Sequence, residues 1–148
     1  MPDILHRVRV TDASPDLTYQ ALTTCEGLGG WWTTDTTGDN REGGVVKFRF
    51  DGGGGFDMEV LELNPGKRVR WLVVDGPQDW IGTRIDWALW PEGDDTVVMF
   101  KHQDWKEPVD FMHHCSTKWA LFLMSLKSLV ETGEGQPWPR DVKTDGAH

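Results

Sequence analysis

The stretch that decides the fold is PVDFMHHCSTKWALFLMSLKSLVETG, residues 108–133. Its large apolar side chains recur at steps of four and three residues, the spacing of one face of an α-helix. The members of this stripe are Phe111, Cys115, Trp119, Phe122, Leu126 and Leu129. Gly133 is suited to end the helix, because glycine adopts the left-handed conformation at little cost. We therefore predict a long amphipathic helix from about Pro108, followed by an extended or disordered tail, residues 134–148.

Upstream of this helix, apolar and polar residues alternate, which is the pattern of half-buried strands. The runs that show it are 4–10, 46–50, 56–63, 69–73, 81–89 and 96–102. Turn-forming residues separate several of them, as in Gly52 to Gly55, Asn64-Pro65-Gly66-Lys67 and Pro91 to Asp95. Short turns of this kind join antiparallel neighbours. An open antiparallel sheet needs a cover on its apolar face, and the long helix is the largest element available, so the predicted fold class is α+β.

Two short helical segments are predicted after the first strand. Ser14-Pro15-Asp16 combines an N-cap residue, a proline at the first helical position and an acid in the first turn. It should open a helix that runs to about Leu22. Residues 26–32, EGLGGWW, are too rich in glycine for a long helix, so we expect a helical turn or loop there. Residues 33–44 are expected to be a polar connection.

Chain length, composition and net charge favour a single-domain protein and argue against a membrane-spanning or nucleic-acid-binding one. The 148 residues suffice for one domain, expected at residues 1–133, and nine Trp and six Phe offset the low apolar content. No apolar run approaches the ~20 residues that span a bilayer, and no export signal is evident. A net charge of −9 would repel nucleic acid phosphates. Cys25 and Cys115 lack zinc or redox spacing, so we expect reduced thiols and a cytoplasmic protein.

The element order and three local motifs resemble a known family. The motifs are Glu26-Gly27-Leu28 before Trp31-Trp32, then Trp80-Ile81-Gly82-Thr83, and Lys118-Trp119 before Leu123, Leu126 and Lys127. From Ile4 to about Gly133 the chain resembles the START-like (SRPBCC) superfamily, within the group named after the C-terminal domain of the heat-shock-protein-90 ATPase activator. The resemblance implies a helix-grip (START-like/TBP-like) fold, in which a curved antiparallel sheet wraps around the C-terminal helix and leaves a deep pocket. Superfamily members bind lipids, sterols, hormones or polyketides there, and some are cyclases or hydrolases.

Thirteen residues are candidates for lining that pocket. Most lie on the predicted inward faces of the strands and on the apolar stripe of the helix, and the others lie on the glycine-rich turn and at the end of the last strand. They are Trp31, Trp32, Phe48, Met58, Trp71, Trp87, Phe100, His102, Trp105, Phe111, Cys115, Trp119 and Phe122. Residues of this kind build either a dense core or an apolar pocket. Trp31 and Trp32 would form a lid over the pocket or plug the end of the core.

Few polar groups are available to orient a ligand. The alternation of the last strand puts His102 on the face of Phe100, and His6 and Lys118 are the other candidates. The favoured alternative for each histidine is a hydrogen bond to a backbone carbonyl. The adjacent pair His113-His114 would point about 100° apart on a helix and could not chelate one metal. We therefore expect no metal and no cofactor, and we assign no catalytic residue.

Three functions fit this sequence. The first is binding of a small hydrophobic or amphipathic ligand in the pocket. The second is a cyclase or hydrolase that uses a histidine as proton shuttle, although the apolar stripe should raise the pKa of Cys115 and leave it a packing residue. The third is a co-chaperone-like interaction module. In the family, that name comes from a domain attached to an N-terminal partner-binding region, which is not found in these 148 residues.

The opposite side of the long helix is more apolar than a solvated face usually is. It carries Ala120, Leu121 and Met124. Packing of the tail around Trp138 would account for this, and contact with a second copy in a homodimer is the alternative.

Overall fold

The computed structural model describes residues 2–50, 54–146 and 148. Within these residues the elements are β1 (Ile4–Val10), α1 (Pro15–Thr23), α2 (Cys25–Trp31), β2 (Asp35–Gly38), β3 (Val45–Phe50), β4 (Gly54–Asn64), β5 (Arg68–Asp75), β6 (Arg84–Glu92), β7 (Asp95–Gln103) and α3 (Asp110–Thr132). The predicted glycine turn lies partly outside the described residues, and Gly54 and Gly55 belong to β4. No helix in the described part is long and apolar enough to cross a membrane.

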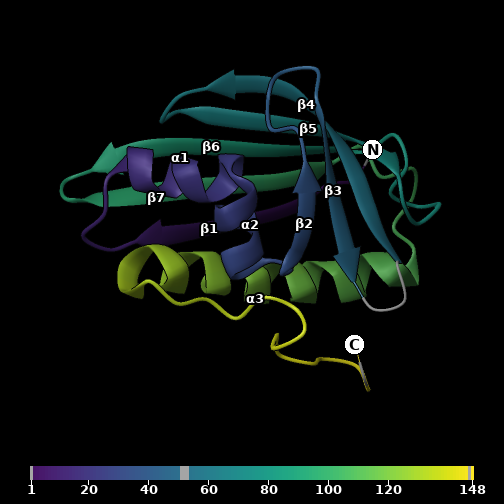
Figure 1. Ribbon diagram of the computed structural model, residues 1–148. Coiled ribbons are helices and arrows are strands. Elements are labelled where there is room, and N and C mark those ends of the chain that lie inside the picture. The colour runs from purple at the N-terminus through teal and green to yellow at the C-terminus, as the bar shows by residue number, and fades with distance from the viewer. Residues whose placement is uncertain (1, 51–53, 147) are drawn as a thin grey trace.

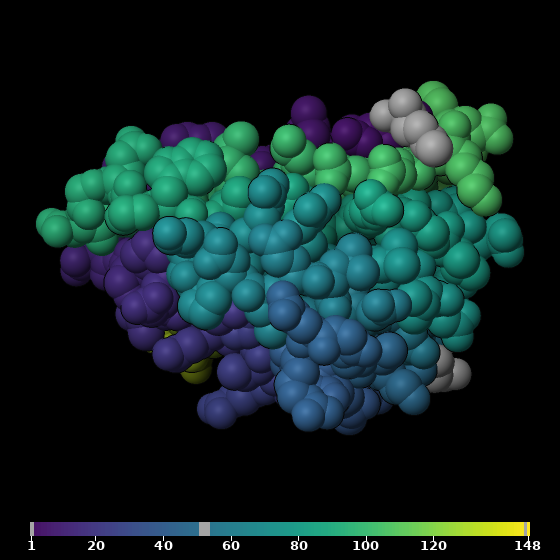
Figure 2. Space-filling model, turned by 90° about the horizontal axis from the view of Figure 1, so that it is seen from above, coloured from purple at the N-terminus to yellow at the C-terminus, as the bar shows by residue number. Residues whose placement is uncertain are grey.

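The strands form one antiparallel sheet in the order β1-β7-β6-β5-β4-β3-β2. Two register shifts between β4 and β5, at Asp57/Met58 and Val60/Glu62, are irregularities that increase local twist and bending. The curved sheet arches over α3, while α1 and α2 lie on the same side (Figure 1). From above, the strands cover the molecule and the yellow C-terminal part is almost entirely hidden (Figure 2). The α+β, helix-grip prediction is confirmed.

Two strand boundaries differ from the sequence prediction. The polar connection predicted at residues 33–44 contains β2, which has no apolar alternation and exists because it pairs with β3, as in Thr36 opposite Phe48. The strand expected from Ile81 begins only at Arg84. The residues just before it fold into a turn, in which the Thr83 hydroxyl donates to the Trp80 carbonyl at 2.6 Å.

The glycine-rich residues 25–31 form an α-helix, α2, although glycine has a low helix propensity. Its capping residue and its packing against α1 explain why. Thr24 caps it by accepting a hydrogen bond from the Gly27 amide at 2.9 Å. A Cβ at Gly27 would lie 2.6 Å from the Ala21 Cα, so glycine lets α2 cross α1 at close range. Gly27 therefore serves packing between the two helices.

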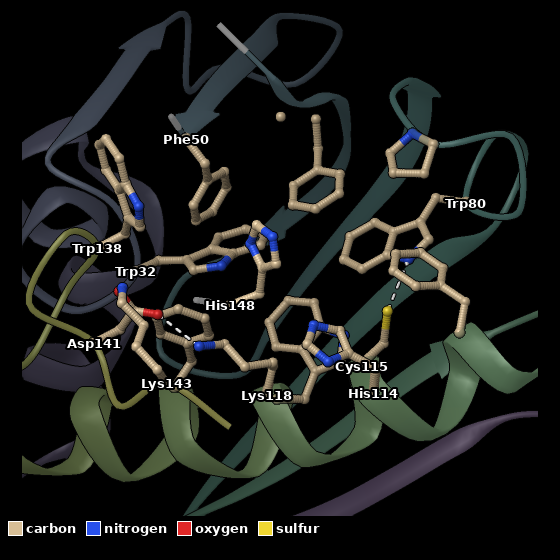
Figure 3. A pocket seen from close by; sticks show the side chains of 16 residues that line it. Trp32, Phe50, Trp80, His114, Cys115, Lys118, Trp138, Asp141, Lys143 and His148 are labelled. Carbon is tan, nitrogen blue, oxygen red and sulfur yellow. Dashed lines mark hydrogen bonds and ion pairs between the residues drawn. The ribbon is translucent and has the colours of Figure 1, made fainter. Parts of the chain in front are cut away.

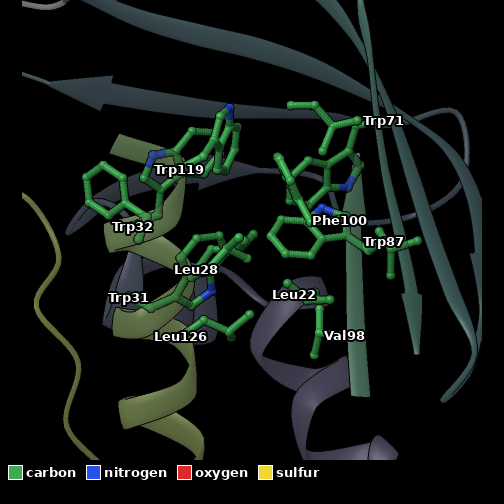
Figure 4. Packing of buried hydrophobic residues seen from close by; sticks show 14 of the residues in the cluster. Leu22, Leu28, Trp31, Trp32, Trp71, Trp87, Val98, Phe100, Trp119 and Leu126 are labelled. Carbon is green, nitrogen blue, oxygen red and sulfur yellow. The ribbon is translucent and has the colours of Figure 1, made fainter. Parts of the chain in front are cut away.

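The core between sheet and helices is dominated by aromatic side chains (Figure 4). The Trp87 ring lies edge-on to Trp71 with ring centres 5.7 Å apart, and it contacts Phe100 at 4.9 Å. Edge-to-face and offset pairs of this kind add to the gain from burial alone. Seven of the nine tryptophans belong to this core, which compensates for the low apolar content.

The tail returns along α3 after Gly133, whose φ of 89° ends the helix. The Gln136 amide donates to the Ser125 hydroxyl at 2.7 Å, and the Trp138 amide donates to the Trp32 carbonyl at 2.8 Å. Trp138 therefore does not cover the outer side of α3, where Met124 remains 52% exposed. Tail packing around Trp138 does not account for that apolar patch.

We predict that Gly27→Ala destabilises the protein by about 1 to 3 kcal/mol, because the added methyl group must displace the α1 backbone. Gly29→Ala is the matched control in the same helix, since its Cβ would meet nothing closer than 3.8 Å. It should stabilise by roughly 0.5 to 1 kcal/mol through helix propensity and chain entropy. Urea unfolding measures both, and equal effects of the two substitutions would contradict the packing account.

Candidate ligand-binding cavity

A cavity of about 340 Å³ lies between α3, the ends of β3 and β4, the loop before β6 and the C-terminal tail (Figure 3). Its size is within the range of small-molecule sites. The residues that line it are Trp32, Phe50, Gly55, Phe56, Pro77, Trp80, Phe111, His114, Cys115, Lys118, Trp119, Phe122, Trp138, Asp141, Lys143 and His148.

Aromatic faces make most of the cavity wall. Trp80 stacks on Phe56 with ring centres 3.9 Å apart and planes 8° from parallel, and on its other side it lies 5.9 Å from Trp119. Trp32 packs against Trp119 at 4.9 Å. Because each ring is held by another ring, the wall is rigid and presents flat apolar surface to an occupant.

Charged side chains gather at one side of the cavity. The Lys118 ammonium donates to one Asp141 oxygen at 2.6 Å and to the Val142 carbonyl at 2.8 Å. The Lys143 ammonium donates to the other Asp141 oxygen at 2.5 Å. Burial alone would raise the pKa of Asp141, but its bonds to the two lysines outweigh burial and lower the pKa below its usual value. Asp141 is therefore an anion shared by two cations.

Cys115 lies in the cavity wall as a free thiol. Its sulfur accepts a hydrogen bond from the Trp80 indole at 3.3 Å. Burial raises the pKa of the thiol to about 12, so it is protonated at neutral pH and is a poor nucleophile. The raised pKa expected from the apolar stripe is confirmed.

Five of the thirteen residues predicted from sequence line this cavity, namely Trp32, Phe111, Cys115, Trp119 and Phe122. The other eight lie outside it and pack in the adjoining core, namely Trp31, Phe48, Met58, Trp71, Trp87, Phe100, His102 and Trp105. The reason is that these large side chains fill the space between sheet and helix by touching one another. Trp31 is fully buried and donates to the Ala21 carbonyl at 2.8 Å, which makes it a plug rather than a lid.

His102 is not at the cavity wall, where we expected it to orient a ligand. It is fully buried, and its Nδ1 accepts a hydrogen bond from the Trp119 indole at 3.2 Å. In the neutral form the proton then sits on Nε2, which donates to the Thr83 hydroxyl at 2.8 Å. Burial lowers the pKa of His102 to about 3. His102 is thus a neutral structural bridge between β7, α3 and the turn before β6.

His6 also lies away from the cavity. Its Nε2 donates to the Ser116 carbonyl at 3.1 Å and so ties β1 to α3. This is the backbone-carbonyl alternative that the sequence left open. Of the three polar side chains predicted to orient a ligand, Lys118 is the one that lines the cavity.

Sequence reasoning missed several lining residues. Phe50 lies on the same strand face as Phe48, so the alternation could have included it. Trp80 belongs to one of the motifs that resemble the family, but the motif does not indicate that Trp80 lines a cavity. Trp138 is the single tryptophan of a polar tail, an unusual placement that indicates packing. Asp141 and Lys143 carry no local signal, because only the return of the tail brings them to the cavity.

A curved antiparallel sheet around a long C-terminal helix, with an aromatic cavity between them, defines a START-like helix-grip protein. The family model described as "Activator of Hsp90 ATPase homolog 1-like protein" matches residues 12–131. The chain therefore belongs to that family of the START-like superfamily. No curated protein sequence matches it.

Solved structures agree with this assignment. The solution structure of the Aha1 dimer from Colwellia psychrerythraea is similar at 47% identity and a TM-score of 0.83, covering 91% of this chain and 100% of that one. CalU16 from Micromonospora echinospora shares 24% identity at a TM-score of 0.70, over 89% and 75% of the two chains. Protein SSP2350 from Staphylococcus saprophyticus shares 18% identity at 0.74, over 90% and 95%. The last two comparisons show a shared fold.

We predict that His102 makes stability depend on pH. The unfolded chain binds a proton with the ordinary histidine pKa of about 6.5, whereas folded His102 binds one only near pH 3. Its contribution is therefore complete above about pH 6.5 and is lost as the pH falls toward 3. Between pH 6 and 4 the wild type should lose about 2 kcal/mol more unfolding free energy than His102→Gln.

Urea unfolding at several pH values measures this difference. The control is His113→Gln, which removes an exposed histidine of α3 and should retain the wild-type pH dependence. Identical pH dependence in the wild type and His102→Gln would contradict the buried neutral state.

Proposed function

We propose that the cavity binds a small hydrophobic or amphipathic molecule without converting it chemically. The observation that carries the proposal is the cavity itself, because about 340 Å³ remains between rigid aromatic walls that are otherwise closely packed. Concave, mostly apolar sites with a few polar groups are the usual form of small-molecule sites.

The state of Cys115 and His102 supports binding over catalysis by either of these residues. The Cys115 thiol is protonated at neutral pH, and His102 lies outside the cavity with both ring nitrogens engaged. A general base must reach the reacting proton with a pKa near the working pH. Neither group meets that requirement, so a cyclase or hydrolase mechanism has no candidate base among these two residues.

The binding proposal predicts that an uncharged amphiphile, dodecanol, changes tryptophan emission and raises the thermal midpoint, because a ligand that binds the folded state stabilises it. His114 lines the cavity, and His114→Trp should fill part of it and weaken binding by about tenfold or more. The adjacent His113 is exposed and outside the lining, so His113→Trp should bind dodecanol like the wild type. Absence of any response in the wild type would refute the proposal.

A second candidate function is favoured by the name of the 47%-identical structure, an Aha1 protein described as a dimer. On that basis we propose self-association and contact with a 90-kDa heat-shock chaperone. Sedimentation of the chain alone should then give a mass near twice 16.8 kDa, and addition of the chaperone should give a faster-moving complex. A constant monomer mass would refute self-association. The absence of a complex at tens of micromolar would refute contact with the chaperone.

A further inference from the structure

The charged side of the cavity carries information about its occupant. Among the described lining residues there are two lysines, Lys118 and Lys143, and one aspartate, Asp141. Two ammonium groups therefore face one carboxylate. Among these three side chains the cations outnumber the anion, although the chain as a whole has a net charge of −9.

The two ammonium groups lie side by side, because they donate to the two oxygens of the same Asp141 carboxylate. Each has a second acceptor in the described structure, the Val142 carbonyl for Lys118 and the Pro139 carbonyl, at 3.3 Å, for Lys143. An ammonium group carries three donors. Counting acceptors among the described residues, one N–H of each lysine is left for a further acceptor.

Partial burial strengthens the attraction of Lys118 for an anion, whereas the Lys143 side chain is 36% exposed. The side chains of Lys118 and Asp141 are only 14% and 7% exposed, so water screens them weakly. The Lys118 ammonium also lies 5.1 Å from the centre of the Phe122 ring, at the border between the charged side and the aromatic wall. In Figure 3, Lys118, Asp141 and Lys143 gather at one side of the cavity and Trp80 and Cys115 lie at the other.

We propose that the ligand of this cavity is an amphipathic anion, whose head accepts hydrogen bonds from Lys118 and Lys143 and whose apolar body lies against the aromatic wall. This inference rests on the proposed function. It adds the charge of the ligand, which the apolar lining alone does not determine. Asp141 holds the two lysines together and competes with the ligand head for them.

The test compares dodecanoate with dodecanol at pH ~8 on the same variants, by tryptophan emission. The two probes have the same alkyl tail and differ in the head group. The difference in head-group hydration is the same for every variant, so a change in the affinity ratio between variants reports the protein's contact with the head. Wild type should prefer the acid, and Lys143→Met should reduce the acid-to-alcohol affinity ratio by about threefold to fivefold, as expected for loss of a partly exposed charged contact.

Two further variants sharpen the result. Lys67→Met makes the same charge change in the turn between β4 and β5, outside the cavity lining, and should leave the ratio at the wild-type value. Asp141→Asn removes the competing anion and should increase the ratio.

The outcomes separate the two proposals. If neither probe binds, the proposed function fails. If both probes bind and the ratio is the same in the wild type, Lys143→Met and Asp141→Asn, the cavity binds apolar tails but the anionic head is refuted.

Discussion

The structure depends on burial of the apolar stripe of α3 under the curved sheet. Trp119 is at the centre of this contact: its ring packs on Phe100 of β7 at 4.5 Å and on Trp32 after α2 at 4.9 Å. Its indole N–H also donates to His102 at 3.2 Å. One side chain thus joins the helix to segments that are far apart in sequence. Large aromatic contacts of this kind let a chain with few aliphatic residues bury enough surface to fold.

The cavity exists because the two halves of α3 have different neighbours. The C-terminal half packs against the short helices, and Leu129 lies so near Gly30 that a Cβ there would be only 3.0 Å away. The N-terminal half, from Phe111 to Phe122, faces the ends of β3 and β4 and the loop before β6. The space left on that side is walled by aromatic rings and bounded by the returning tail. The same helix therefore closes the core at one end and lines a cavity at the other.

Two groups that could otherwise transfer protons or attack a substrate are inactive at neutral pH, because burial keeps the Cys115 thiol protonated and His102 neutral. The cations at the cavity share Asp141 and retain donors for another acceptor. Since one fold carries many functions, this local arrangement, and not the fold, supports the binding proposal.

The sequence by itself determined the long helix, the strands that alternate clearly and the α+β class, because these follow from local periodicity. It also determined which side chains turn inward, as Trp71 and Trp87 show. Whether an inward side chain joins the core or the cavity wall was decided only by the tertiary structure, because it depends on the volume that other segments fill. The same holds for Asp141 and Lys143, which reach the site only because the tail returns along α3 and pairs with residues near Trp32. Pairing over such distances in sequence leaves no periodic trace in the residues themselves.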